Sequence, residues 1–549
     1  MTSTLPQDSQ PTAVADPSAF RDLPSLLAMH AAQQPHATAV VVEGERVDYA
    51  ELNAVIDRVA ATLQREGLGP GDCIALCGAS SIEYVALFVG ALRAGLAAAP
   101  LAPSSMPQQL ADMAADAGAR WVFIDGAVAA MNAPWRAGTR LLRMDDRHAA
   151  GVPSDQNLQT WLIAPGTKPA AVQIQPEWPF NLIYSSGTTG TPKGIVQPHA
   201  MRWAHFQRAA LSGYDRSTIT LSATPLYSNT TLVSVLPTLA HGGCLVLMPK
   251  FDAGTYLQLA QQHRATHTML VPVQYQRLMA RPDFDQYDLS SFRHKFCTSA
   301  PFHADLKADV LKRWPGGLTE YYGMTEGGGT VILHAHLHPN KLHTVGQPSE
   351  GHDIRLIDED GLELRRTPGG ASAVSGEVVG RSPGMMTGYH GRPDLTAAAE
   401  WFDAEGRRYI RTGDVGRFDE DGFLILHDRR KDMIISGGFN IYPSDLEAVL
   451  RQHPAVADAA VVGVPSEAWG ETPVAFVVRR EGRSDSAEAV QSDINAQLGK
   501  TQRLSALRWV DELPRSAIGK VLKRELRDTW TAHAQPGTDP LNINRTETA

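Results

Sequence analysis

The 549-residue sequence is poor in cysteine and has no excess of basic residues. Its four cysteines are too few for a disulfide-stabilised scaffold and form no C-x-x-C pair typical of structural zinc, so we expect reduced, ordinary core residues. Asp and Glu outnumber Lys and Arg by 59 to 50, a net charge of −9. Without a broad positive field, nucleic acid is not an expected partner.

Long apolar runs are also missing. The longest uncharged stretch, residues 217–249, is interrupted by proline, asparagine and histidine, which favours buried α/β structure over a membrane span. The first residues lack the basic segment and apolar segment of a secretory signal. The sequence therefore predicts a soluble, cytoplasmic protein with no stable membrane insertion.

The composition is that of a globular protein, 43% hydrophobic and 20% charged, and the length suffices for several domains. Up to about residue 340, short apolar runs alternate with helix-like stretches such as 52–66 and 82–94, which predicts a parallel α/β fold. The polar ends, residues 1–20 and 531–549, are expected to be flexible.

The pattern changes in the last third of the chain. Asp-Gly turns separate short alternating segments over about 341–430, which predicts a small β-rich subdomain. A compact α+β pattern follows over 431–530. The charged run at 428–432 marks the expected boundary between the two.

The most informative segment is Y-S-S-G-T-T-G-T-P-K-G at residues 184–194, directly after a strand-like run. Glycine permits positive φ values, so successive amides and hydroxyls can surround a phosphate group. The segment is not a G-x-x-x-x-G-K-[ST] loop, because Pro192 precedes its lysine. The candidate phosphate ligands are Ser185, Ser186, Gly187, Thr188, Thr189, Gly190 and Lys193.

This segment resembles the signature of the adenylate-forming superfamily, which includes acyl-CoA synthetases, adenylation domains of peptide synthetases and beetle luciferases. Further matches follow in that family's order: Y-G-M-T-E at 322–326, R-T-G-D at 411–414, a hinge and glycine loop at 428–443, and P-R-S-A-I-G-K at 514–520. The resemblance implies an α/β fold: a large N-terminal domain, residues 21–430, with two α/β subdomains and a small β-barrel, then a small mobile α+β domain, residues 431–530.

The resemblance also implies a reaction. A carboxylate resists nucleophiles, so the family transfers AMP to it from ATP, releasing pyrophosphate and forming an acyl-AMP with a good leaving group. By this resemblance, Lys520 would bridge the carboxylate and the α-phosphate, Thr325 would contact the α-phosphate, and Glu326 would bind Mg²⁺. These three residues are the catalytic candidates.

The resemblance assigns further contacts. Tyr322 would stack on adenine, and Asp414 and Arg429 would bind the ribose. The other implied positions complete the nucleotide site, the hinge and the CoA passage: they are Ala300, Glu320 and Tyr321 for ATP and AMP, Lys431 for the hinge, and Gly437, Gly438 and Phe439 for CoA.

One segment departs from the family pattern. Where acyl and aryl ligases carry P-x-F-H, this chain reads P-L-Y-S-N at 225–229, so Ser228 replaces the histidine. Relatives that activate amino acids have an aspartate there, because a buried ammonium without a partner is costly; Ser228 therefore argues against an α-amino acid. By analogy, the acid pocket would be lined by Tyr227, Ser228, Asn229, Thr298, Ser299, Met324, Gly327 and Gly328.

The leading interpretation is an acid–CoA ligase that forms acyl-AMP and then transfers the acyl group to CoA, with a medium-sized apolar or aromatic acid as substrate. The alternative within the superfamily is a stand-alone adenylating enzyme that loads a carrier protein or forms an amide. From another class, a luciferase-like oxygenase would share every motif. The sequence leaves open the acid, the second acceptor and the oligomeric state, a homodimer included.

Overall fold

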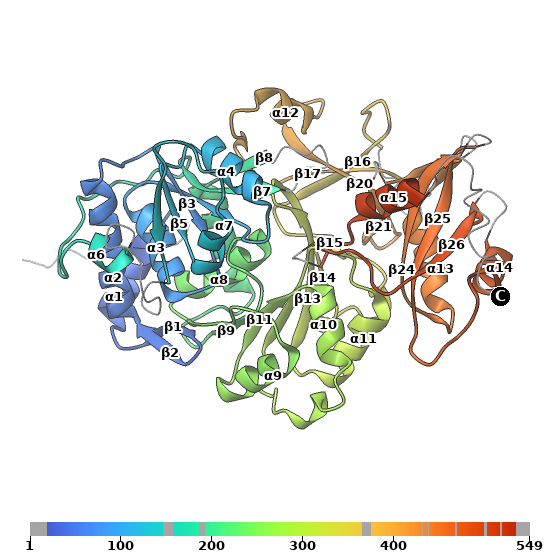
Figure 1. Cartoon of the computed structure of the whole chain (residues 1–549), viewed down its shortest axis with the longest axis horizontal. Helices are drawn as coiled ribbons and strands as arrows, with labels where there is room; N and C mark the ends of the chain where they lie inside the picture. The colour runs from blue at the N-terminus through green and yellow to red at the C-terminus, as the bar shows by residue number, and fades with distance from the viewer. Residues whose placement is uncertain are drawn as a thin grey trace, which may run out of the picture.

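The computed structural model describes residues 19–145, 157–185, 193–364, 375–429, 432–436, 439–466, 469–498, 502–516 and 519–533, without the side chains of 185, 428, 429, 439 and 440. These ranges form four β-sheets with helices packed against them (Figure 1). Strand and helix alternate through the first two sheets, so the α/β class expected from the sequence is confirmed.

The first sheet has seven strands in the order β18-β8-β7-β4-β3-β5-β6. Neighbours from β7 to β6 are parallel, whereas β8 and β18 are antiparallel. All five residues of β3 are buried, as expected for a strand covered on both faces. The strands are β3 (Cys73–Cys77), β4 (Ala97–Leu101), β5 (Trp121–Ile124), β6 (Arg140–Arg143), β7 (Pro179–Ser185), β8 (Lys193–Pro198) and β18 (Gly388–Tyr389).

The second sheet has nine strands in the order β15-β14-β13-β12-β11-β9-β10-β1-β2. Its central strands are parallel, and β13 turns directly into antiparallel β14. The strands are β1 (Thr38–Val42), β2 (Glu45–Asp48), β9 (Ile219–Ser222), β10 (Cys244–Leu247), β11 (His267–Leu270), β12 (His294–Cys297), β13 (Gly317–Met324), β14 (Gly327–His334) and β15 (Gln347–Pro348).

Helices cover these two sheets, and several begin at side-chain caps. At the start of α2, Asp48 accepts a hydrogen bond from the Glu51 amide at 2.8 Å, and Glu51 accepts one from the Asp48 amide at 3.0 Å. The helices are α1 (Leu23–Gln33), α2 (Tyr49–Arg65), α3 (Ile82–Arg93), α4 (Pro107–Asp116), α5 (Gly126–Ala130), α6 (Leu158–Trp161), α7 (His199–Leu211), α8 (Asn229–Ala240), α9 (Ala253–Gln262), α10 (Pro272–Met279) and α11 (Ala304–Arg313).

The third sheet is barrel-like and lies in the region expected to be β-rich. An Asp-Gly turn joins its longest strand to the next, with Gly422 at φ 82°. The short strand β18 comes from the same stretch of chain but pairs with β8 in the first sheet, so this region is not a single sheet. The elements are β16 (Asp353–Ile357), β17 (Gly376–Arg381), α12 (Pro393–Ala398), β19 (Glu400–Phe402), β20 (Arg408–Phe418) and β21 (Leu424–Arg429).

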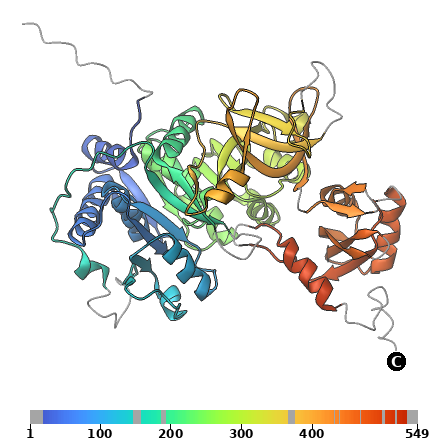
Figure 2. The ribbon, with the colours of Figure 1, turned by 90° about the horizontal axis from the view of Figure 1, so that it is seen from above.

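The fourth sheet belongs to the C-terminal part and has its own hydrophobic core. Figure 2 shows it with its helices as a separate body beside the larger sheets. The elements are β22 (Ile434–Ser436), β23 (Phe439–Ile441), α13 (Pro443–Gln452), β24 (Val456–Ser466), β25 (Gly470–Arg479), α14 (Ala487–Gln497), β26 (Ala506–Val510) and α15 (Lys523–His533).

The chain ends differ slightly from expectation. The Phe20 ring packs edge-on against His199 and Trp203, and α15 continues to His533, so residues at both predicted flexible ends take part in the fold. Packing against aromatic rings decides the first case, which the polar composition around Phe20 does not reveal. Residues 1–18 and 534–549 lie outside the described ranges.

Two expectations about the core are confirmed. All four cysteines are free, three are buried, and burial raises the pKa of the Cys73 thiol to about 12. The uncharged stretch at 217–249 folds into β9, α8 and β10, which are largely buried. In the described parts of the chain, no helix combines the length and apolar character needed to cross a membrane.

Candidate active site

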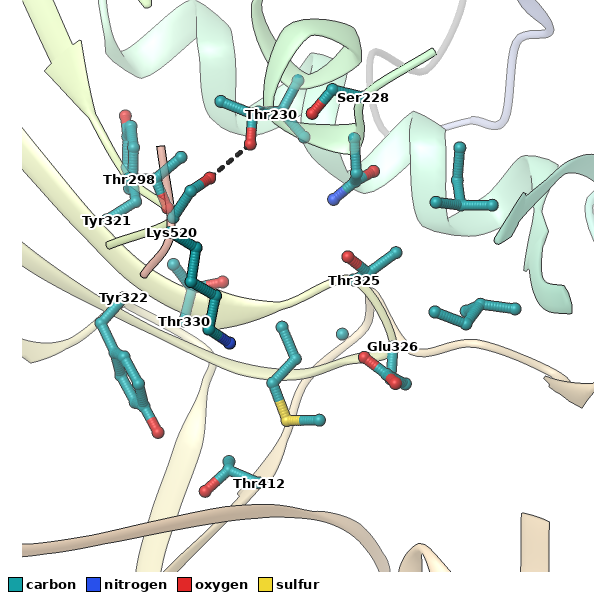
Figure 3. A pocket seen from close by; sticks show the side chains of 18 of the residues that line it. Ser228, Thr230, Thr298, Tyr321, Tyr322, Thr325, Glu326, Thr330, Thr412 and Lys520 are labelled. Atoms are coloured by element: carbon teal, nitrogen blue, oxygen red, sulfur yellow. Dashed lines mark hydrogen bonds between the residues drawn. The ribbon is translucent and has the colours of Figure 1, made fainter. Parts of the chain in front are cut away.

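A cavity of about 1760 Å³ lies between α7, the start of α8, the β13–β14 turn, β20 and the segment before α15. Figure 3 shows its lining, to which segments far apart in the sequence contribute. We name two parts of this lining. The reactive end is the set Thr325, Glu326 and Lys520, and the α7 end is the group around Arg208, which includes His205, Tyr321, Thr330 and His352.

Thr325 and Glu326 form the tight turn between β13 and β14. The Gln197 side-chain amide donates to the Thr325 carbonyl at 2.6 Å, and the Met386 amide donates to the Glu326 carbonyl at 2.8 Å. Because the backbone of the turn is held from two sides, both side chains are fixed facing the cavity (Figure 3).

The Glu326 carboxylate has one oxygen engaged and one available. Tyr389 donates to its Oε1 at 2.8 Å, and the Lys193 ammonium lies 5.4 Å from the centre of the Tyr389 ring. Burial and the nearby carboxylate raise the pKa of Tyr389, so its hydroxyl remains a donor. No described residue is recorded as a partner of Oε2.

This donor set fits Mg²⁺, which binds through one or two carboxylates together with water and phosphate oxygens. Among the described residues no group of three His, Cys, Asp or Glu side chains could enclose a metal ion. Glu326 therefore suits a role as a single protein ligand beside phosphate groups, as the sequence predicts.

A buried network of polar side chains holds the backbone of Thr325 in place. Arg202 donates to Asn181 Oδ1 at 2.9 Å and to Asn229 Oδ1 at 3.0 Å, and it also bonds Gln197 Oε1. Burial lowers the pKa of Arg202 to about 9. Through Gln197, the network joins the first turn of α8 to the Thr325 backbone. Sequence reasoning missed it, because Arg202, Asn181 and Gln197 belong to no motif.

Two motifs meet on the wall below the turn. The Tyr322 hydroxyl donates to Asp414 Oδ2 at 2.8 Å, and Thr412 Oγ1 accepts from the Asp414 amide at 3.0 Å. Tyr322, Thr412 and Gly413 line the cavity. The two residues predicted to contact adenine and ribose are thus adjacent in space.

The C-terminal motif places Lys520 in the same cavity. The Ser516 amide donates to the Lys520 carbonyl at 2.8 Å, and the Gly519 amide donates to the Ser516 carbonyl at 2.8 Å, closing a tight turn. Gly519 has φ 76°, and a Cβ there would lie 2.7 Å from Val273 Cγ1 on α10. Glycine therefore lets the turn press against the large body, and the Lys520 side chain extends into the cavity (Figure 3).

The predicted acid pocket is largely brought together. Ser299 has a positive φ of 84°, and its hydroxyl lies 2.5 Å from Thr230 Oγ1 at the start of α8. Gly328 does not line the cavity; its Cβ position faces the Gly380 carbonyl at 2.9 Å, so its small size lets β14 approach β17. The predicted residues that do line the cavity are Tyr227, Ser228, Asn229, Thr298, Ser299, Met324 and Gly327.

Three further nucleotide candidates are Ala300, Glu320 and Tyr321. Ala300 and Glu320 are not among the cavity residues, and the Glu320 carboxylate forms a buried ion pair with Lys307. Tyr321 packs against Phe296, with ring centres 5.6 Å apart, and lies at the α7 end. Their nucleotide roles stay predictions.

Several predicted residues fall outside the described part of the chain. Nothing in the structure tests the phosphate loop beyond its flanks, the hinge or the CoA passage. The residues concerned are Ser186, Gly187, Thr188, Thr189, Gly190, Lys431, Gly437 and Gly438, together with the side chains of Ser185, Arg429 and Phe439.

The α7 end was not predicted from the sequence. His205, Arg208 and Ser212 follow one another at helical spacing along one face of α7 and its C-cap, and Thr330 and His352 come from β14 and the start of the barrel-like sheet. The spacing defines a helix face. No local pattern shows that this face borders a cavity.

Comparison with known proteins agrees with this geometry. The family model of the AMP-binding enzymes matches residues 27–390, and the model of their C-terminal domain matches residues 445–520. A feruloyl-CoA synthase from Amycolatopsis sp. is 35% identical over 506 residues, 90% of this chain and 96% of that protein.

Two solved structures illustrate the range of relatives. ATP-bound MatB from Rhodopseudomonas palustris has a TM-score of 0.81 and 29% identity, covering 94% of this chain and 100% of its own. Amide bond synthetase McbA from Marinactinospora thermotolerans has a TM-score of 0.80 and 28% identity, covering 93% and 99%. The fold and the cavity thus define an adenylate-forming enzyme. The chain belongs to the AMP-binding superfamily and, within it, to the family of AMP-forming acid–CoA ligases.

Proposed function

We propose that this enzyme activates a carboxylic acid with ATP to acyl-AMP and pyrophosphate and then transfers the acyl group to the thiol of CoA. The observation that carries the proposal is the meeting of Lys520 with Thr325 and Glu326 in one cavity that has further volume beside them. A cation, a hydroxyl and a carboxylate at one place suit the joining of two anions, carboxylate and α-phosphate.

In the first step, a carboxylate oxygen of the acid attacks the α-phosphorus, and the bond from that phosphorus to the pyrophosphate oxygen breaks. The Lys520 ammonium screens the two anions and stabilises the charge of the transition state. Thr325 donates to an α-phosphate oxygen, and Asp414, beside Tyr322, accepts from the ribose hydroxyls. Bound Mg²⁺ would neutralise phosphate charge, and Glu326 would hold it with Oε2.

In the second step, the CoA thiolate attacks the acyl carbon, the carbon–oxygen bond to AMP breaks, and the thiol proton passes to solvent. Lys520 occupies the cavity in the first step, so the C-terminal part must turn for the thiol to arrive. We assign the hinge to Lys431 and the passage to Gly437, Gly438 and Phe439, which follows the resemblance alone.

A second candidate keeps the first step and changes the acceptor. The similarity to amide bond synthetase McbA favours an enzyme in which an amine takes the place of CoA, and the similarity to a fatty acid–[acyl-carrier-protein] ligase favours a carrier-protein thiol. The first half-reaction and all its residues are the same in both cases. The second acceptor is therefore the point to test.

The test is a screen of carboxylic acids for ATP-dependent pyrophosphate release, with and without CoA, with mass spectrometry of acyl-AMP and acyl-CoA. We expect acyl-CoA only when ATP, the acid and CoA are all present. Gly437→Leu should retain pyrophosphate release and accumulate acyl-AMP. Acyl-AMP that reacts with amines and never with CoA would favour the second candidate, and no pyrophosphate with any acid would contradict both.

A further inference from the structure

The α7 end of the cavity contains a cation for which the described residues provide no anionic partner. Arg208 lines the cavity, and its Nη1 donates to Thr330 Oγ1 at 3.3 Å. Its guanidinium carbon lies 5.7 Å from the centre of the Tyr321 ring. In the described part of the chain no Asp or Glu forms an ion pair with it.

This arrangement leaves Arg208 incompletely satisfied. A guanidinium carries five N–H donors in a planar fork, and here a single long bond to a hydroxyl is recorded. Burial lowers the pKa of Arg208, which shows that its charge is poorly solvated. Two other buried arginines are better satisfied: Arg93 donates to Asp57 at 2.7 Å, and Arg202 donates to the amide oxygens of three side chains. An unpaired charge in a poorly solvated place costs free energy. We therefore expect Arg208 to bind an anionic group.

None of the described neighbours of Arg208 is recorded as a negatively charged partner. His352 Nδ1 accepts from the Thr330 amide at 2.8 Å, so the proton of the neutral ring lies on Nε2. Burial and Arg208 lower the pKa of His352 to about 4, which keeps it neutral near pH 7. Glu350 also lines the cavity, but it is exposed and forms no recorded pair with Arg208.

Arg208 contacts β14 beyond the turn that holds Thr325 and Glu326. Thr330, its hydrogen-bond partner, lies three residues beyond Gly327 on β14, about 10 Å from the turn of Thr325 and Glu326 at the usual rise of a strand. The apolar side chains of Val233, Met269 and Phe296 also line the cavity, where they cluster with Tyr321 beside the α7 end. Such a spacing and such walls suit an aromatic ring or a medium-length carbon chain.

We propose that Arg208 binds a second carboxylate, so that the substrate is a dicarboxylic acid with an apolar middle, activated at one end and held by Arg208 at the other. This inference rests on the proposed function, since it requires that the cavity bind a carboxylic acid. Arg208 can receive the second carboxylate through two parallel N–H···O bonds, a geometry that a neutral group does not match. The inferred substrate therefore keeps the apolar or aromatic body expected from the sequence and carries a second carboxylate.

The experiment compares each dicarboxylic acid with its own monomethyl ester. The panel contains aliphatic diacids of increasing length and an aromatic diacid with carboxyl groups on opposite sides of the ring, each assayed by pyrophosphate release. The two members of a pair share one reactive carboxylate and differ only in the charge at the far end. We expect kcat/KM of the wild type to favour the best diacid over its ester by about 10²-fold or more, as for sites built to bind a polar group.

Three variants test whether the preference for the diacid depends on the Arg208 guanidinium. Arg208→Gln should lose most of this preference by losing the diacid alone, with kcat/KM for the ester unchanged within about threefold, and Arg208→Lys should keep part of it. Arg277→Gln, which removes an exposed arginine from α10, should keep the full preference. Thermal unfolding of each variant reports whether it is folded.

The possible outcomes distinguish the inference about Arg208 from the proposed function. Equal kcat/KM for diacid and ester in the wild type, or the same ratio in Arg208→Gln, would overturn the inference and leave the proposed function intact. Equal loss of both members in Arg208→Gln would show that Arg208 binds the reacting carboxylate instead. No pyrophosphate from any acid would contradict the proposed function itself.

Discussion

The two ends of the cavity are built in different ways. The reactive end is formed by short segments whose important residues are consecutive, such as the β13–β14 turn and the turn before Lys520. The α7 end is formed by one face of a helix together with residues from β13, β14 and the start of the barrel-like sheet. One end is therefore recognisable as motifs, and the other exists only once the chain has folded.

The proposed function accounts for the difference. In it, the reactive end would bind phosphate, metal and a carboxylate, which are the same for any acid, and such binding needs backbone amides and a few fixed side chains in tight turns. The α7 end would contact the part of the acid that distinguishes one substrate from another. Changes at the reactive end should therefore affect all acids equally, and changes at the α7 end should affect them selectively.

The largest effect is expected for Lys520→Ala. Loss of the ammonium should slow acyl-AMP formation by about 10²–10³-fold for every acid, because charge in the transition state is no longer stabilised. ATP binding and thioester formation from supplied acyl-AMP should remain. Single-turnover assays of both half-reactions measure this, with Lys312→Ala, an exposed lysine of α11, as the control. An unchanged adenylation rate would remove Lys520 from the mechanism.

The second-largest effect is expected for Gly519→Ala, which changes the turn that positions Lys520. Gly519→Ala adds a Cβ 2.7 Å from Val273 Cγ1 at a position with φ 76°, so the turn can no longer seat against α10. We expect acyl-AMP formation to fall by about tenfold or more, with thioester formation from acyl-AMP unaffected.

Adding Val273→Ala to Gly519→Ala separates the steric clash from the backbone strain. The double variant removes the clash and keeps the backbone strain, so partial rescue of adenylation is expected. Equal loss of both half-reactions in Gly519→Ala would argue against a role of this contact in one step only.

A smaller, uniform effect is expected for Gln197→Leu. The change removes the bond to the Thr325 carbonyl and the acceptor of the buried Asn181 Nδ2, while Arg202 keeps its bonds to Asn181 and Asn229, so the free energy of unfolding should fall by about 2 kcal/mol. kcat/KM should fall by roughly tenfold through misplacement of Thr325. Urea unfolding and kinetics with a diacid and its ester measure both, and a loss confined to one member of the pair would contradict the division into two ends.

The smallest effect is expected for Ser228→His. Ser228 precedes α8, lines the cavity and makes no side-chain capping bond, so the larger ring would mainly take space. We expect a loss in kcat/KM of a few fold for bulky acids and less for small ones, because overpacking penalises the larger ligand. Kinetics over acids of increasing width check this. An unchanged profile would place Ser228 outside the acid path.

The sequence predicted well wherever structure is set by neighbours along the chain. The helix-like stretches at 52–66 and 82–94 correspond to α2 and α3, and an Asp-Gly turn at 421–422 connects β20 and β21. Glu320 shows the limit of this reasoning. It lies next to a motif, yet its side chain turns from the cavity to a buried pair with Lys307, because successive residues of a strand face opposite sides.

The sequence by itself thus determined the α/β class and predicted which residues form the reactive end, because turns, periodicity and motif residues act over a few positions. Only the tertiary structure decided that Arg202 and Gln197 support Thr325, that Gly519 contacts Val273, and that Arg208 faces the cavity with no ion pair to a described carboxylate. Each of these facts depends on elements distant in sequence packing at a particular register. The free energies of such contacts arise from burial and pairing, which no single segment contains.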